Sequence, residues 1–224
     1  MTTFREATRT TTPENFLYWK GKAKKSGLYD VLVNFETVSM YNVHPVLIRE
    51  VFEKDKPLKN LQPNDDLLSR SISPWPMVLF FDLLTEANGV PPSWNQYFNA
   101  MMSTYRDKWI DYVFNDKIPY KKQVKAARWR MGNAYIAWMR ELLILTELRQ
   151  KGFKVHRHTF ADVEGKVDLF TLDPLKGVSI TVKSNWDAKK KKPTIPSIKV
   201  YLPSSGDLNI PRHSMEDIEN WLST

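Results

Sequence analysis

Two neighbouring strand-like segments carry charged residues in positions where burial would be costly. Asp168 interrupts the apolar alternation of KVDLFTL, and Lys183 follows the alternation of VSITVKS. A buried charge costs free energy unless it is paired or binds a metal ion. Because side chains of a strand alternate between its two faces, Thr181 and Lys183 are expected on one face, opposite Val178. The two charged residues are therefore candidates for a site rather than for a core.

A third charged residue, Glu141, lies on the apolar stripe of a predicted helix. It shares the helix face with Trp138, Leu145 and other apolar residues spaced by three, four and seven. If this helix packs on the sheet, Glu141, Asp168 and Lys183 converge on one point. Two carboxylates suit a divalent cation such as Mg²⁺ or Mn²⁺, and an ammonium group can orient water or offset charge on a phosphate. The three residues thus predict metal-assisted hydrolysis of a phosphodiester.

The charge of the chain is concentrated in its C-terminal part. The 224 residues carry 33 Lys and Arg against 25 Asp and Glu, a net charge of +8. Up to Tyr120 the two signs balance, so the whole excess lies beyond that residue. This asymmetry predicts a lobe that binds a polyanion, attached to a neutral one.

Two basic segments are candidates for contact with nucleic acid. The loop NWDAKKKKPTIPS contains Lys189, Lys190, Lys191 and Lys192, and Arg128 and Arg130 flank Trp129 near the start of the predicted helix. We expect these six cations to contact phosphates. A loop that only keeps the chain soluble remains the alternative for the lysine run.

Composition excludes several other classes of protein. Hydrophobic residues make up 42% of the chain, which argues against disorder. The chain has no cysteine, which excludes disulfides and thiolate metal sites, and eight glycines leave little scope for phosphate-binding glycine loops. The polar N-terminus and the lack of a long apolar stretch predict a cytoplasmic protein that does not contact a membrane.

The pattern of the sequence predicts an α+β or α/β protein in two parts. Residues 1–120 are expected to form a mainly α-helical region for recognition, dimerisation or partner contact. Residues 121–224 are expected to form a lobe with a mixed four-stranded sheet flanked by helices. The predicted helices cover 14–27, 44–55, 74–89, 93–116, 121–151 and 214–222, with a linker at 56–74, and the predicted strands cover 153–159, 166–172, 178–184 and 198–202.

Some details of these elements are also predicted. Gly152 is expected just beyond the end of the long helix, and Ser214 is expected to cap the start of the last one. Tyr97 and Met101 begin an aromatic stripe on the helix 93–116 that indicates a core or a partner interface.

The segment from Glu141 to Lys183 resembles the core of the PD-(D/E)xK nuclease superfamily, the family of restriction-endonuclease-like folds. The similarity is carried by REL…QKGFKVHRH…GKVDLF…ITVKSN and spans residues 130–203. In this family a helix bears a glutamate, a Gly-aromatic step leads into a strand, the next strand carries an aspartate, and a further strand carries (D/E)-x-K. The resemblance implies that Glu141, Asp168 and Lys183 are the catalytic residues of a metal-dependent nuclease.

One position departs from the family pattern. Thr181 stands two residues before Lys183, where the family has an acid or sometimes glutamine. Three explanations follow. Metal is held by Glu141, Asp168 and the Val182 carbonyl with water, or another acid such as Asp187 or Glu164 takes part, or the lobe binds nucleic acid without cutting it.

Two functions of different class follow. The first is a Mg²⁺-dependent endodeoxyribonuclease that acts on double-stranded DNA, as a homodimer or in a larger protein complex; cleavage of RNA is a weaker variant of it. The second is a degenerate nuclease-fold subunit that binds nucleic acid or scaffolds a complex.

His156 and His158 lie on the same face of the predicted strand 153–159. One of them, if it lies near the cleft, is a candidate general base, and a structural role for both is the alternative.

Overall fold

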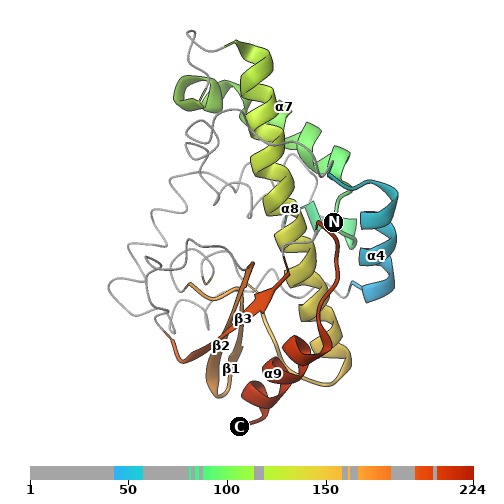
Figure 1. Cartoon of the computed structure of the whole chain (residues 1–224), viewed down its shortest axis with the longest axis vertical. Coiled ribbons are helices and arrows are strands. Elements are labelled where there is room, and N and C mark those ends of the chain that lie inside the picture. Colours follow the sequence, from blue (N-terminus) through green and yellow to red (C-terminus); the bar gives the residue numbers. More distant parts are fainter. Residues whose placement is uncertain are drawn as a thin grey trace.

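The described residues form a mixed α+β structure. The computed structural model describes residues 43–57, 81, 84–85, 88–113, 119–157, 161, 166–182, 195–203 and 206–224. Over these residues it has the helices α4 (Pro45–Lys54), α7 (Trp94–Val113), α8 (Tyr120–Gln150) and α9 (Arg212–Ser223), and the strands β1 (Leu169–Leu172), β2 (Leu175–Val182) and β3 (Ser197–Leu202) (Figure 1). The predicted α+β class is confirmed, and each of these seven elements falls on a segment for which the same type was predicted.

The three strands form one mixed sheet in the order β1-β2-β3. Strands β1 and β2 are antiparallel, with Leu169 opposite Val178, and β2 and β3 are parallel, with Val178 opposite Ile198. The prediction of a mixed sheet is therefore confirmed.

The predicted strand 153–159 is not one of the strands of the described sheet. In this part of the chain His156 makes an isolated antiparallel bridge with Phe170, through N–H···O bonds of 2.7 and 2.9 Å. Strand β1 has only four residues, so few residues of this segment can pair with it. Among the described residues the sheet thus has three strands and one bridge, instead of four strands.

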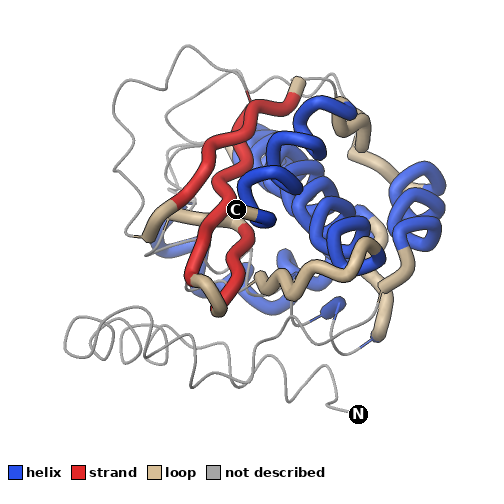
Figure 2. The backbone as a smooth tube through the Cα atoms, turned by 90° about the horizontal axis from the view of Figure 1, so that it is seen from below, coloured by secondary structure: helices blue, strands red, loops and turns tan. Residues whose placement is uncertain are grey.

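Helices cover one face of this sheet. The sheet, α8 and α4 follow one another across the molecule, and α9 lies on the same side of the strands as α8 (Figures 1 and 2). The main hydrophobic core includes Leu143 of α8, Leu169 of β1, Val178 of β2 and Ile218 of α9, none of which is exposed. One core therefore joins α8 to the sheet and also to α4 and α7.

The long helix α8 ends as its sequence predicts. Gly152 has a φ of +91°, the left-handed conformation that favours glycine. Its N–H bonds to the Arg149 carbonyl at 3.0 Å, and the Phe153 N–H bonds to the Leu148 carbonyl at 3.1 Å. These bonds satisfy carbonyl groups at the end of the helix and turn the chain toward the sheet.

The predicted aromatic stripe of α7 contributes to the core at its first two positions. Tyr97 and Met101 have no exposed surface, and the Tyr97 ring lies 5.8 Å from the ring of Tyr135 in α8. The buried Tyr135 hydroxyl donates a hydrogen bond to the Pro92 carbonyl at 2.9 Å. Burial, with a smaller effect of Asp55, raises the pKa of Tyr135. These aromatic rings build a core rather than a cofactor site.

The last helix begins earlier than predicted. Helix α9 starts at Arg212 after Pro211, and Ser214 is its third residue, so the prediction of Ser214 as the N-cap is wrong. The fixed φ of proline suits the entry to a helix. The Ser214 hydroxyl instead lies 3.5 Å from the Tyr201 carbonyl oxygen and faces β3.

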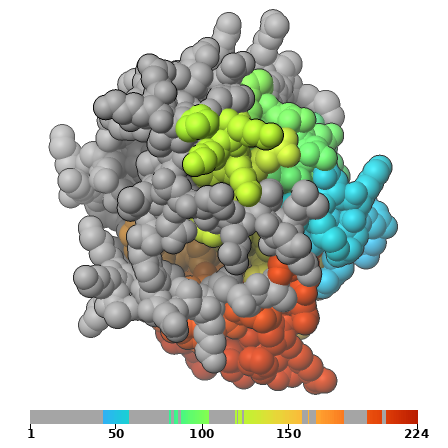
Figure 3. Space-filling view, turned by 45° about the horizontal axis from the view of Figure 1, so that its top comes forward, coloured from blue at the N-terminus to red at the C-terminus, as the bar shows by residue number. Residues whose placement is uncertain are grey.

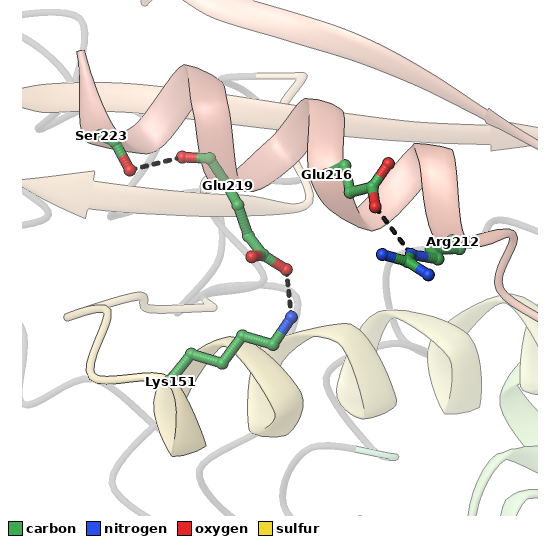
Figure 4. A network of polar contacts seen from close by, with 5 residues as sticks. All are labelled: Lys151, Arg212, Glu216, Glu219 and Ser223. Atoms are coloured by element: carbon green, nitrogen blue, oxygen red, sulfur yellow. Dashed lines mark hydrogen bonds and ion pairs between the residues drawn. The ribbon is translucent and has the colours of Figure 1, made fainter.

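Ion pairs and hydrogen bonds fasten α9 to its neighbours. Lys151, just beyond α8, pairs with Glu219 of α9, whereas Arg212 and Glu216 pair with each other within α9 at 2.8 Å (Figure 4). The Trp221 indole donates to the Gly177 carbonyl of β2 at 3.0 Å. The contacts of Glu219 and Trp221 hold α9 against both α8 and β2.

The other predicted elements are only partly within the described residues. Residues 81, 84, 85 and 88 of the predicted helix 74–89 are helical. The predicted helix 14–27 lies outside the described residues, as does the predicted linker beyond residue 57. In the described part of the chain, no helix has both the length and the apolar character needed to cross a bilayer. The boundary between the parts 1–120 and 121–224 stays a prediction.

Candidate functional site

Asp168 sits at the point where β1 separates from β2. Its backbone N–H bonds to the Val178 carbonyl at 2.9 Å, and its carboxylate accepts a hydrogen bond from the Ile180 N–H of β2. The carboxylate thus takes the place that a backbone carbonyl would hold in a longer strand β1. The bond from the Ile180 N–H therefore holds the Asp168 carboxylate against β2, one residue before Thr181.

Thr181 lies on the face of β2 that points away from α8. Val178 and Ile180 belong to the core shared with α8, so the alternating residues Ser179 and Thr181 point to the opposite face. Thr181 is 9% exposed, and the Ser179 hydroxyl donates to the Lys166 carbonyl at 2.7 Å. The predicted orientation of Thr181 is confirmed.

Strand β3 extends this polar face. Because paired residues of parallel strands share a face, Lys199 lies beside Ser179, and Tyr201 lies beside Thr181. Both β3 residues are exposed, and the Lys199 ammonium lies 5.0 Å from the centre of the Tyr201 ring. Two hydroxyl groups, a cation and an aromatic ring therefore meet on the strand pair next to Asp168.

Glu141 is held by a cation inside the fold. It is 6% exposed, and its Oε2 accepts a hydrogen bond from Nε of Arg157 at 3.2 Å and forms an ion pair with Nη2 at 3.1 Å. Arg157 is 3% exposed, and its guanidinium lies 5.9 Å from the centre of the Phe81 ring. The observed role of Glu141 is that of a buried ion pair between α8 and the segment that follows it. Its role as a metal ligand stays a prediction.

Several predicted site residues fall outside the described residues. Lys183 follows the last described residue of β2, and nothing is described of the side chain of Val182, which ends that strand opposite Leu202. The alternative acids Glu164 and Asp187, the candidate base His158 and the predicted phosphate contacts Lys189, Lys190, Lys191 and Lys192 also lie outside. The convergence of Glu141, Asp168 and Lys183 therefore stays a prediction, and the described residues show only that Asp168 is bonded to β2.

The two predicted arginine contacts of α8 have different surroundings. Arg128 is exposed, and its guanidinium lies 4.8 Å from the centre of the Phe98 ring of α7. Arg130 is half-buried, its pKa is lowered by burial, and its buried Nε has no hydrogen-bond partner among the described residues. The first turns of α8 reach the surface beside α7 (Figure 3). Because Arg128 is exposed, a polyanion can reach it.

His156 lies against the sheet. Its ring centre is 5.7 Å from that of Phe170, and burial, with a smaller effect of Arg149, lowers the pKa of His156. The neutral imidazole is thus favoured in the fold. Of the two predicted histidines, only His156 lies within the described residues, and it supports the bridge to β1.

The donor atoms near Asp168 fit a hard divalent cation in type. The Asp168 carboxylate, the Thr181 hydroxyl and the Val182 carbonyl are all oxygen donors of the kind that Mg²⁺ and Mn²⁺ accept. They carry one negative charge, since the charge of Glu141 is balanced by Arg157. Within the described residues, no three His, Cys, Asp or Glu side chains are grouped so that they could hold a metal ion.

Sequence reasoning missed Arg157, Lys199 and Tyr201. Arg157 precedes His158 in the segment predicted as a strand, and its partner Glu141 comes from the helix before the Gly152 turn. An available signal was the alternation of IKVYL, which places Lys199 and Tyr201 on one face and apolar residues on the other.

No protein-family model, no curated protein and no solved structure matches this chain.

Proposed function

We propose that residues 121–224 form a nuclease-like lobe of the PD-(D/E)xK type, which hydrolyses phosphodiester bonds of double-stranded DNA with Mg²⁺ or Mn²⁺. The observation that carries the proposal is the hydrogen bond from the Ile180 N–H to the Asp168 carboxylate. It joins Asp168 to β2, the strand that Lys183 follows in the sequence, and the resemblance assigns both residues to one site.

The order of the elements supports the same proposal. Helix α8 is followed by a Gly-Phe step, a segment bridged to β1, the antiparallel pair β1–β2, and then β3 parallel to β2. The positive net charge of the chain fits a polyanionic substrate.

Each residue has a proposed role. Asp168 and the Val182 carbonyl would hold the metal ion, and the Thr181 hydroxyl and water would supply further oxygen donors. When bound, the ion polarises the phosphate and lowers the pKa of water. Lys183 orients the attacking water and offsets the negative charge that develops on the phosphate. The exposed Arg128 and the run Lys189–Lys192 contact the DNA backbone.

Substitution of Asp168 by asparagine tests this assignment without removing the structural bond. The amide oxygen of the introduced side chain can still accept from the Ile180 N–H, whereas the negative charge is lost. We expect Asp168→Asn to lower metal-dependent cleavage of plasmid DNA by more than about 100-fold, since even residues that only support metal ligands change activity by 10- to 100-fold. Lys183→Ala should lower cleavage to a similar extent.

Matched controls separate these effects from general loss of charge. Asp217→Asn removes an exposed carboxylate of α9, and Lys54→Ala removes an exposed ammonium of α4. Both controls should cut as the wild type does. Cleavage by Asp168→Asn at the rate of the wild type, with the thermal stability unchanged, would overturn the proposed site.

A second candidate function is binding of nucleic acid without cleavage. Two observations favour it: Glu141 is neutralised by Arg157, and Thr181 supplies a hydroxyl in place of a carboxylate. In that case wild type and Asp168→Asn would bind duplex DNA equally, and neither would cut it in Mg²⁺ or Mn²⁺. A gel-shift assay beside the plasmid assay distinguishes the two functions.

A further inference from the structure

We propose that Tyr201 and Lys199 of β3 bind an unpaired nucleotide of a DNA strand, with the base stacked on the Tyr201 ring and its phosphate paired with Lys199. This contact lies beside Thr181 of the proposed metal site, so the inference rests on the proposed function. It adds to that function a substrate class: DNA with a single-stranded end, overhang or gap.

The exposure of Tyr201 is the first support. Along β3 the burial alternates, with Val200 and Leu202 only 4% and 2% exposed, while Tyr201 is 41% exposed. Among the described residues, the large hydrophobic side chains that are exposed are Val46, Leu47 and Tyr201. Tyr201 is the aromatic one of the three. An exposed aromatic ring on a sheet face is the kind of platform on which bases of single strands stack.

The second support is the cation next to the ring. The Lys199 ammonium lies over one face of the Tyr201 ring, 5.0 Å from its centre, so a base would stack on the other face. A positive charge beside an aromatic ring matches the two parts of a nucleotide, since the phosphate attracts the ammonium and the base stacks on a ring face. The charge complementarity selects nucleic acid over an apolar partner.

The third support is the strand register. Tyr201 is paired with Thr181, and Lys199 with Ser179, in the parallel pair β2–β3. Adjacent strands are about 4.8 Å apart, so a nucleotide on Tyr201 lies within one nucleotide length of Thr181. The Ile180 N–H between these two β2 residues holds Asp168. The nucleotide would therefore lie next to the proposed site.

The substrate class follows from the stacking contact. In a duplex both faces of each internal base are covered by neighbouring bases, so a base can stack on Tyr201 only where it is unpaired or flipped out. Stacking on one aromatic ring does not depend on the identity of the base. We therefore expect DNA with an unpaired stretch to be preferred over blunt duplex DNA, whatever its sequence.

Binding of fluorescently labelled DNA tests the inference without any cleavage. Anisotropy is measured in EDTA for a short single strand and for the same sequence as a blunt duplex. Tyr201→Ala should weaken single-strand binding about tenfold and leave duplex binding unchanged, whereas Tyr201→Phe should bind both as the wild type does. Tyr201→Leu keeps the apolar bulk without the aromatic ring and should behave as Tyr201→Ala, which provides a second variant if the alanine variant is unstable.

The role of Lys199 is tested by the salt dependence. Lys199→Ala should reduce the slope of log K against log salt for the single strand by about 0.7, the change expected for one lost phosphate contact. Lys54→Ala, which removes an exposed lysine of α4, should leave the slope unchanged.

The outcomes separate this inference from the proposed nuclease. Equal single-strand affinities of wild type, Tyr201→Ala and Tyr201→Leu would overturn the inference, as would an absence of single-strand binding by the wild type, even if plasmid DNA is cut. If the Tyr201 variants lose single-strand binding and the wild type cuts no DNA, the stacking contact stands and the nuclease proposal falls.

Discussion

The two faces of the β1–β2–β3 sheet differ in how their polar groups are placed. Toward α8, polar and charged groups are closed into the fold: Glu141 pairs with Arg157, and Arg140 donates from Nε to the Asp207 carbonyl at 2.7 Å and from Nη1 to the Pro203 carbonyl at 3.1 Å. On the opposite face, the β2–β3 end carries Thr181 and the exposed Tyr201. Charged groups that are paired inside the core stabilise the fold. We therefore assign the candidate catalytic residues to the other face of the sheet.

The opposite face is itself divided. Near β1 it is apolar, with Val167, Phe170 and Ile195 in a small second core. Near β3 it is polar, and Asp168 lies between the two halves, bonded to Ile180. This arrangement explains why an aspartate is tolerated next to apolar strands: its carboxylate takes the place of a backbone acceptor, which satisfies part of its need for hydrogen bonds.

The largest expected effect on stability comes from breaking the buried ion pair. Glu141→Ala leaves the Arg157 charge buried without its carboxylate, so the free energy of unfolding should fall by about 3 to 5 kcal/mol. Urea denaturation followed by circular dichroism measures this change. The double variant Glu141→Leu with Arg157→Leu, which removes both charges, should lose much less. A loss below about 1 kcal/mol for Glu141→Ala would contradict the structural role of the pair.

A smaller effect is expected on the opposite face at Gly177. A Cβ at this position would lie 2.6 Å from Cγ1 of Val167 and 3.1 Å from Cδ1 of Ile195. Gly177→Ala should therefore lower the free energy of unfolding by about 1 to 3 kcal/mol. Combination with Val167→Ala removes the closest atom, so the double variant should lose less than the sum of the two single losses. Strictly additive losses would show that the close approach is not what requires glycine.

The smallest expected effect is a dependence of stability on pH through His156. Burial, and to a lesser extent Arg149, lower the pKa of His156 below the 6.5 of an unperturbed histidine. As the pH falls, the His156 imidazole is therefore protonated in the unfolded chain before it is protonated in the folded protein. The stabilising contribution is complete above about pH 6.5 and is lost as the pH falls from 6.5 through the folded pKa.

A variant without this imidazole isolates the contribution. His156→Gln should show a smaller fall in melting temperature between pH 7 and pH 5 than the wild type does. His213→Gln, which changes an exposed histidine of α9, should melt with the pH dependence of the wild type. Identical pH dependence of wild type and His156→Gln would contradict the lowered pKa.

The sequence allowed the elements to be predicted where local signals are strong. The apolar spacing of α7 and α8 and the glycine after α8 predicted those helices, because these signals act within a few residues. The alternation in VSITVKS predicted which side of β2 faces the core. The N-cap of α9 was predicted three residues late, since Ser214 was preferred over Pro211 as the beginning of the helix.

The candidate site was predicted only in part, because it depends on contacts between distant segments. Asp168 was identified as an interruption of an apolar pattern, but its bond to Ile180 depends on the strand register. The partner of Glu141 could not be deduced, since Arg157 reaches it only after the chain has turned at Gly152. Tyr201 could be identified only from the structure, because the pairing of β3 with β2 brings it beside Thr181.

Binding of Mn²⁺ tests most directly whether the metal ion binds on the face of the sheet that carries Asp168. Isothermal titration calorimetry with the wild type, Asp168→Asn and Glu141→Gln compares the two faces, since the amide oxygen introduced by Glu141→Gln can still accept hydrogen bonds from Arg157. We expect Asp168→Asn to lose Mn²⁺ binding and Glu141→Gln to retain it. Loss of binding in Glu141→Gln with retention in Asp168→Asn would contradict the account and place the metal on the side of α8.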